Sequence, residues 1–361
     1  MEPLKEMFNK SFYKQFADVI SNTDKNFNAT AFVKDATHNL ENLELNGRLR
    51  NTSLILKKHL SQDYKKALDV LIKATPSLPG GYRALVMPDF VSLYGKDHFD
   101  MSMEALKYFT SFGSSEFAIR EFLKTDLTKT LKVMNKWAED KNHHVRRLSS
   151  EGSRPRLPWS FKLEEIIKNP KLTTSILEKL KADEELYVRK SVANHLNDIS
   201  KDNTPYMLQL IKSWDHTDPN TKWIIKHASR NLIKTGNPDS LAIFSFEKNV
   251  KVRIDKFKLS HSEIQLGDEL KFEFRVTSEK STPQKLVIDY AIHYPKSSGN
   301  LSRKIFKLKE INLAPVQQLH ITKKQLFKDL TTRKHFSGKH EIEIMVNGKI
   351  LATKSFKLKT H

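Results

Sequence analysis

The chain has 361 residues, of which 38% are hydrophobic and 29% charged, as is typical of a globular protein of about two domains. Its 62 Lys and Arg exceed its 42 Asp and Glu, and the resulting net charge of +20 favours a polyanionic partner, either nucleic acid or an acidic membrane surface. The absence of cysteine excludes disulfides, thiolate zinc sites and cysteine nucleophiles.

Residues 1–245 carry the periodicity of amphipathic helices. Apolar residues recur at four-residue spacing near the start of the chain and predict one apolar stripe on the first helix: Phe8, Phe12, Phe16 and Ile20. Ser61 and Asp63 mark the start of a later helix. Prolines and glycines, for example at 79–81 and at Pro219, are expected to end helices along this region.

Three segments in the second half of this region resemble one another. They are VRRLSSEG from Val145, VRKSVANHL from Val188 and IKHASRNLI from Ile225, and each places an aliphatic–basic pair before a helix with small packing residues. The pairs are offset by 43 and 37 residues, which suits HEAT-type helix pairs of roughly 40 to 47 residues. Such pairs stack into a solenoid with a concave binding face, and an irregular helical bundle is the alternative.

After Phe246 the hydrophobic period changes to two, which is typical of strands. About seven short strands with turns such as Asn347-Gly348 predict an immunoglobulin-like β-sandwich over residues 248–361. This region contains 24 Lys and Arg against 11 Asp and Glu, a net charge of +13. The lysines suit a DNA-binding domain, but lysines on exposed strand faces also protect sheet edges.

The densest cluster of functional side chains lies at Asn142–Trp159, NHHVRRLSSEGSRPRLPW. It holds two histidines, the single acid Glu151 and four arginines, Arg146, Arg147, Arg154 and Arg156. Clustered arginines suit phosphate binding. One acid among cations is a candidate for chemistry on a cationic substrate.

This segment, with SSEFAIREFL from Ser114 and YVRKSVANHLNDISKD from Tyr187, resembles the AlkC branch of the HEAT-like-repeat DNA alkylation-repair glycosylases. The resemblance covers residues 1–245, and some members of this branch carry an immunoglobulin-like domain after the helices. It implies that N3-alkylated adenine, a cationic base, is removed from double-stranded DNA without metal or cofactor. Related members act on a bent duplex without drawing the base into a deep pocket.

The chemistry explains why acids are needed. A cationic base leaves readily, so the enzyme must stabilise an oxocarbenium-like sugar and place water at C1′, and a fixed carboxylate serves both purposes. Glu116, Glu151 and Asp198 are the candidate catalytic acids, and the resemblance implies that matching acids line the concave face. Alternatively, Glu116 caps a helix or pairs with Arg120, and Asp198 is a solvated helix end.

The predicted DNA-binding residues are basic or aromatic. Arg147 and Arg154 would contact phosphates on either side of the lesion, although each could instead pair with Glu151. Trp159 follows a proline in a loop-like segment and could stack on an exposed base or sugar, whereas core packing suits Trp137. Arg156 and Arg189 complete the set. No metal site is expected, because the adjacent histidines at 143–144 point to different helix faces.

Three functions therefore compete. The first is a monomeric, monofunctional DNA glycosylase of the bacterial cytoplasm, which fits an N-terminus without a signal peptide and a chain without any apolar run of about 18 residues. The second is a non-catalytic HEAT-like scaffold for nucleic acid or protein, and the third a membrane-surface adaptor. The acids discriminate among them, because a phosphate-binding scaffold has no use for carboxylates on its concave face.

Overall fold

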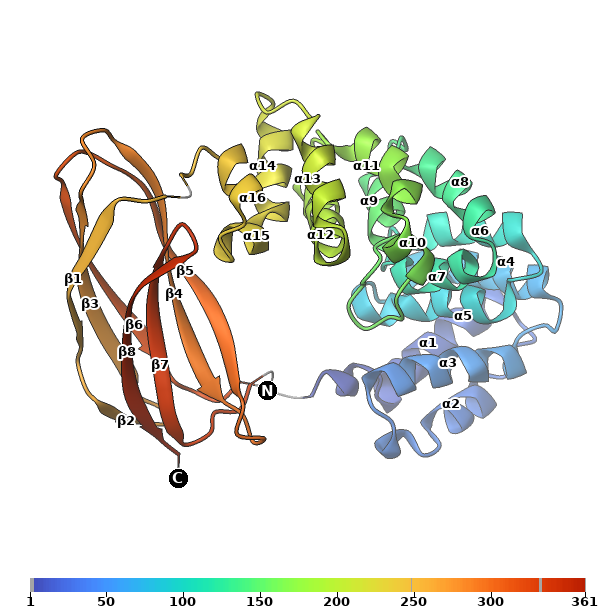
Figure 1. The fold of residues 1–361 in the computed structure, drawn as a ribbon. Helices are drawn as coiled ribbons and strands as arrows, with labels where there is room; N and C mark the ends of the chain where they lie inside the picture. The colour runs from blue at the N-terminus through green and yellow to red at the C-terminus, as the bar shows by residue number, and fades with distance from the viewer. Residues whose placement is uncertain (1–2, 248, 331–332, 361) are drawn as a thin grey trace. The chain divides into compact units, whose positions relative to one another are not determined.

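The structure is a computed structural model that describes residues 3–247, 249–330 and 333–360 (Figure 1). The chain forms two compact units, Met1–Ala228 and Ser229–His361. Among the described helices, none combines the length and apolar character that a bilayer crossing requires.

The first unit consists of helices joined by short turns. Its α-helices are α1 (Lys10–Thr23), α2 (Ala29–Thr37), α3 (Leu45–His59), α4 (Tyr64–Ala74), α5 (Val86–Tyr94), α6 (Phe99–Phe109), α7 (Glu116–Thr125), α8 (Leu127–Trp137), α9 (His143–Gly152), α10 (Glu164–Lys168), α11 (Thr174–Leu180), α12 (Leu186–Asp202), α13 (Thr204–Lys212) and α14 (Pro219–Ala228). The 3₁₀ turns are η1 (Leu4–Met7), η2 (Leu40–Asn42), η3 (Thr75–Ser77), η4 (Gly81–Leu85) and η5 (Pro170–Thr173).

These helices stack in two layers. In one layer α3, α5, α7, α9, α12 and α14 each pack on the next, and this layer lies on the hollow side of the arc that the first unit forms (Figure 1). Helices α4, α6, α8 and α11 form the outer layer behind it. This arrangement confirms the predicted HEAT-like solenoid. Val145, Val188 and Ile225 are buried within α9, α12 and α14, so the repeated pairs lie inside successive helices rather than before them.

Local sequence explains where the helices begin. Asn9 accepts a hydrogen bond from the Phe12 amide at 2.9 Å and caps α1, whose stripe through Phe16 is buried as predicted. Asp63 caps α4 in the same way. Pro219 occupies the first position of α14, where its missing N–H has no cost, so this proline starts a helix rather than ending one.

The second unit is the predicted immunoglobulin-like sandwich, preceded by two short helices. Strands β1, β3 and β6 form one sheet, and the other has the order β2-β8-β7-β4-β5. Side chains from both sheets fill one apolar core. The elements are α15 (Arg230–Lys234), α16 (Pro238–Ile243), β1 (Val252–Leu259), β2 (Glu263–Gln265), β3 (Glu269–Ser278), β4 (Gln284–Pro295), β5 (Leu301–Leu313), β6 (Gln318–Leu326), β7 (Gly338–Val346) and β8 (Lys349–Lys359).

The second unit begins at Ser229, before the point after Phe246 at which the hydrophobic period changes to two. Ile233 of α15 and Leu241 of α16 pack with Phe246 on Val287 of the sheet. Asn347, in the predicted hairpin turn between β7 and β8, donates from its amide to the Glu247 carbonyl at 2.8 Å and so holds the linker. Helices α15 and α16 therefore belong structurally with the sandwich.

Candidate active site

The three candidate acids lie on three consecutive inner helices. Glu116 is the first residue of α7, Glu151 lies in the last turn of α9, and Asp198 lies in α12. Glu151 is 5% exposed and Asp198 only 1%. Helix α12 continues to Asp202, so the expectation that Asp198 could be a solvated helix end is wrong. Because α7, α9 and α12 pack in sequence, the fold brings the acids together from positions far apart in the chain.

Two arginines connect the acids into one chain of ion pairs. Arg147 contacts Glu116 at 2.7 Å (Nη1–Oε2) and Glu151 at 3.6 Å (Nη2–Oε1). Arg154 contacts the same Glu151 oxygen at 2.6 Å through Nη1 and Asp198 Oδ2 at 2.8 Å through Nε. Positive and negative groups therefore alternate along the row, and each acid is held in place by a planar guanidinium.

Both arginines are buried with the acids. Their side chains are only 14% and 9% exposed. Burial lowers the pKa of Arg147, but the Glu116 and Glu151 carboxylates more than offset this and hold it above its ordinary value. The pKa of Arg154 is likewise raised, against the effect of burial, by Glu151 and Asp198. The geometry thus gives Arg147 and Arg154 the ion-pairing role that the sequence had left open beside phosphate contact.

The row of charges borders a pocket of about 580 Å³. Glu116, Arg147, Glu151 and Arg154 line this pocket, hereafter the acid pocket, together with aromatic side chains that include Trp159. Asp198 is not among the lining residues. It supports Arg154 from behind and pairs through its other oxygen with Lys201 at 2.9 Å. The two glutamates therefore line the pocket, whereas Asp198 is connected to it only through Arg154.

The loop after α9 contributes Trp159 to the aromatic lining of the acid pocket. Trp159 is 73% exposed and has a positive φ of 65°, a left-handed conformation that is strained for a residue with a β-carbon. Arg120 of α7, fully buried, donates through Nη1 to the carbonyls of Gly152 at 3.0 Å and Arg154 at 2.6 Å, and through Nη2 to that of Phe161. One buried guanidinium therefore fixes the whole loop that presents Trp159.

Gly152 allows the close approach of α9 to α7. A β-carbon at this position would lie 2.5 Å from Cγ2 of Ile119, a distance that real β-carbons do not adopt. The glycine in the SSEGSR motif therefore sets the separation of the helices that carry Glu116 and Glu151.

The other predicted contact residues lie outside the row of ion pairs. Arg156 forms a bidentate pair with Asp202 at 2.6 and 2.7 Å, and its side chain is 28% exposed. Arg189 donates to the carbonyls of Asp183 and Glu184 near the start of α12. Trp137 is 4% exposed and packs in the core, which confirms its predicted role.

Comparisons with known proteins identify the family of this chain. Residues 104–232 match the family model described as DNA alkylation repair enzyme, and residues 253–360 match that of the C-terminal Ig-like domain of the uncharacterised protein YhaZ. YhaZ of Bacillus subtilis is 38% identical over 99% of this chain and 100% of its own length. The Pseudomonas fluorescens alkylpurine DNA glycosylase AlkC, solved bound to DNA containing an abasic site analogue, is 45% identical over 99% of this chain and all of that chain, with a TM-score of 0.96. The chain belongs to the AlkC branch of the DNA alkylation repair enzymes.

Some residues of this AlkC-branch site were not singled out by sequence reasoning. The sequence predicts Arg120 only as a possible helix partner of Glu116, yet in the structure Arg120 holds the loop through backbone carbonyls. Its position among Ile119, Phe122 and Leu123, all buried, was the available signal, because an arginine on an apolar helix face must find internal partners. Tyr187, whose ring lies 4.6 Å from the Arg147 guanidinium, carried no comparable signal.

His195 of α12 should make the stability of this AlkC-branch protein depend on pH. The ring is fully buried and its Nδ1 donates to the Ser150 carbonyl at 3.0 Å, next to Glu151. Burial lowers its pKa from 6.5 to about 4. Below pH 6.5 the unfolded chain binds a proton that the folded chain does not, so the stability present at neutral pH is lost as the pH falls. We expect the free energy of unfolding to fall by roughly 2 kcal/mol between pH 7 and pH 5.

Denaturant unfolding at pH 5, 6 and 7 tests this pH dependence. His195→Gln should lower stability at pH 7 and flatten its dependence on pH, while His38→Gln at an exposed position serves as the control. An unchanged pH profile in His195→Gln would show that other groups govern acid stability.

Proposed function

We propose that this protein is an alkylpurine DNA glycosylase that hydrolyses the N-glycosidic bond of cationic N3-alkylated adenine in double-stranded DNA. Membership of the DNA alkylation repair enzymes and the likeness over the whole chain to a solved alkylpurine DNA glycosylase support the activity. The observation that carries the proposal is the row of three carboxylates held by Arg147 and Arg154 at the acid pocket.

The arrangement suits an oxocarbenium-like sugar. Glu116 and Glu151 present fixed negative charge to the pocket that they line. Their positions are set before the substrate arrives, so no reorganisation is required as positive charge develops on the sugar. One of the two acids opposes that charge, and the other orients water toward C1′. Asp198 acts through Arg154, which it holds against Glu151.

The arginines also make the pocket tolerable to DNA. Three uncompensated carboxylates would repel the phosphates on either side of the lesion, whereas Arg147, Arg154 and Lys201 bring the local charge close to neutral. Replacing a buried ion pair by apolar residues often has little effect on stability, so these pairs are better explained by positioning than by folding energy. The need to hold the acids in position therefore explains why Arg147 and Arg154 pair with carboxylates inside the protein instead of being exposed to solvent.

Contacts to DNA come from residues around the pocket. Trp159, exposed and held in a strained backbone, stacks on a base or sugar exposed at the bend. Arg156 and Arg189, which lie outside the row of ion pairs, bind phosphates, and the basic sandwich adds further contacts to the DNA backbone. The protein acts as a monomer in the cytoplasm of a bacterium.

A glycosylase assay separates this function from that of a non-catalytic scaffold. We expect free 3-methyladenine to be released from methylated duplex DNA with EDTA present, and borohydride to trap no enzyme–DNA adduct. Activity should survive EDTA because each candidate acid is already paired with an arginine. No covalent adduct is expected because the cationic base needs little help to leave. Heat-denatured protein is the control for spontaneous depurination.

Two outcomes would contradict the proposal. Tight binding of methylated duplex with no release of base would favour the scaffold. A covalent adduct trapped by borohydride would favour a lysine nucleophile and a bifunctional enzyme.

A further inference from the structure

The hydroxyl of Ser114 forms a complete set of hydrogen bonds at the edge of the acid pocket. Its Oγ donates to Oε2 of Glu116 at 2.7 Å and accepts from the Glu116 amide at 3.2 Å and from Nη1 of Arg147 at 3.1 Å. A serine hydroxyl has one donor and two acceptor positions, so all of them are used. Because an amide and a guanidinium can only donate, the hydroxyl hydrogen has to point at the Glu116 carboxylate.

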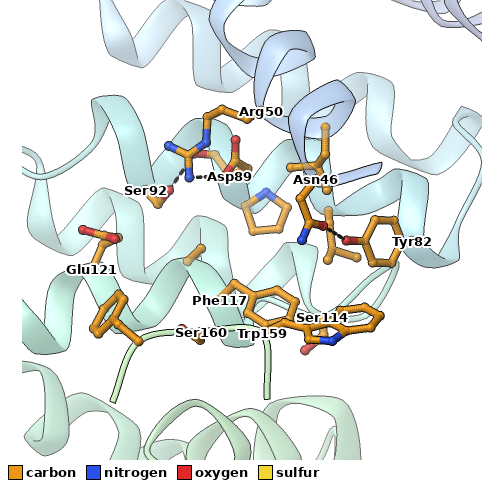
Figure 2. A pocket seen from close by; sticks show the side chains of 15 residues that line it. Asn46, Arg50, Tyr82, Asp89, Ser92, Ser114, Phe117, Glu121, Trp159 and Ser160 are labelled. Carbon is orange, nitrogen blue, oxygen red and sulfur yellow. Dashed lines mark hydrogen bonds and ion pairs between the residues drawn. The ribbon is translucent and has the colours of Figure 1, made fainter. Parts of the chain in front are cut away.

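The turn that carries Ser114 is fixed by its neighbours. The Ser115 hydroxyl, fully buried, donates to the Leu106 carbonyl of α6 at 2.8 Å. A β-carbon at Gly113 would lie 2.7 Å from the Gly81 carbonyl oxygen, so a glycine is required for this close approach. Ser114 itself lines both the acid pocket and a neighbouring cavity of about 370 Å³ (Figure 2). A rigid piece of backbone therefore presents its hydroxyl to the site.

Ser114 leaves one oxygen of Glu116 available to a substrate. Oε2 is occupied by Ser114 and by the ion pair with Arg147 at 2.7 Å, whereas Oε1 accepts no hydrogen bond from the described residues. Glu116 lines the acid pocket. Glu151 and Asp198, by contrast, are held through cationic side chains. Whichever of the two proposed roles Glu116 has in the reaction, Oε1 is the oxygen that performs it.

The serine also occupies a group that could compete for the carboxylate. Glu116 is the first residue of α7, and acidic side chains at a helix N-terminus are attracted to its free amide groups. The Glu116 amide is already bonded to Ser114 Oγ. Arg147 divides its charge between Glu116 and Glu151. A glutamate side chain has several rotatable bonds, so a second fixed donor restricts the positions that its carboxylate can adopt.

From this geometry we infer that Ser114 is a positioning residue, which fixes the Glu116 carboxylate so that Oε1 faces the reacting sugar. This inference rests on the proposed glycosylase function. Ser114 acts through Glu116 and touches no reacting atom itself. The alternative is that its hydroxyl only caps the start of α7, in which case it contributes to stability and not to the rate of excision.

Single-turnover excision of 3-methyladenine from methylated duplex DNA by the full chain tests this role. Ser114→Ala should lower the maximal rate constant by about tenfold to hundredfold, because it removes a hydrogen bond to a charged group. DNA affinity and the amplitude of the reaction should be unchanged, whereas a merely unfolded fraction would lower the amplitude. Ser114→Thr keeps the hydroxyl and should recover most of the rate. If Ser114→Ala does not fold, Ser114→Cys replaces the hydroxyl by a weak donor of similar size.

The control is a helix cap away from the pocket. Asp63 accepts from the Lys66 amide at 3.2 Å at the start of α4 in the outer layer. Asp63→Ala should lower the temperature of unfolding, because a cap is lost, and should excise at the unaltered rate.

A double-mutant cycle with Glu116→Ala identifies the route by which Ser114 acts. Ser114→Ala should change the rate of the Glu116→Ala protein by less than about twofold, since the carboxylate that it positions is already absent. An equal loss in both backgrounds, excision at the unaltered rate in Ser114→Ala, or a Ser114→Thr variant as slow as Ser114→Ala would overturn the positioning role and leave the glycosylase intact. Failure of the unaltered protein to release any base would overturn the glycosylase, and this role with it.

Discussion

Glu151→Gln is expected to reduce single-turnover excision of 3-methyladenine by about 10²- to 10³-fold, because one preorganised charged group at a reacting centre commonly contributes that much. Glu151 carries the largest expected effect, since it lines the acid pocket and pairs with both Arg147 and Arg154. Glu116→Gln and Asp198→Asn should also reduce the rate. Saturating protein on a duplex with one lesion separates the chemical step from binding.

The control for these variants is a surface acid that also forms an ion pair. Glu139 is 66% exposed and pairs with Lys179 at 2.6 Å. The Glu139→Gln variant should excise 3-methyladenine at the normal rate. Amide replacement keeps a hydrogen-bond acceptor for the arginines but removes a buried negative charge, so each variant should unfold at a lower temperature, and excision is compared at a temperature where all variants remain folded. Excision at the unaltered rate in all three variants would remove the carboxylates from the mechanism.

Removing the second unit is expected to weaken DNA binding and to flatten its dependence on salt. The sandwich region, residues 248–361, carries a net charge of +13, and each phosphate contact it makes contributes about 0.9 to the slope of log affinity against log salt. The truncation should end at Ala228 rather than before the strands, because α15 and α16 pack on the sandwich and would be left with exposed apolar surface. Fluorescence anisotropy at several salt concentrations measures the slope.

Excision should remain measurable in the truncated protein at saturating concentration, because all three acids lie in the first unit. An unchanged affinity and slope would make the second unit a folding or protein-interaction module. Normal binding with no excision would mean that this unit shapes the active complex on the duplex. Charge-neutral substitutions on its exposed lysines in the full chain would then distinguish charge from folding.

Much of the fold is predictable from local pattern. The four-residue spacing of Phe12, Phe16 and Ile20 specifies the buried face of α1, because helical geometry alone places these side chains together. The period of two after Phe246 and the Asn347-Gly348 turn, with φ of 47° and 79°, likewise specify strands and a hairpin. These features depend on neighbours within a few residues, so no knowledge of distant contacts is needed.

The sequence by itself determined the helical and strand-rich halves and the basic charge, since each is a matter of residue type and short spacing, and its resemblance to the AlkC branch singled out the three candidate acids. Only the tertiary structure decided what the arginines beside those acids do. Arg147 and Arg154 could bind phosphate or carboxylate, and the choice depends on how closely α7, α9 and α12 approach, which Gly152 and Arg120 set through packing and buried hydrogen bonds. A guanidinium pairs with the anion that the fold places nearest to it. The distance between the arginines and the acids depends on the packing of helices that are far apart in the chain.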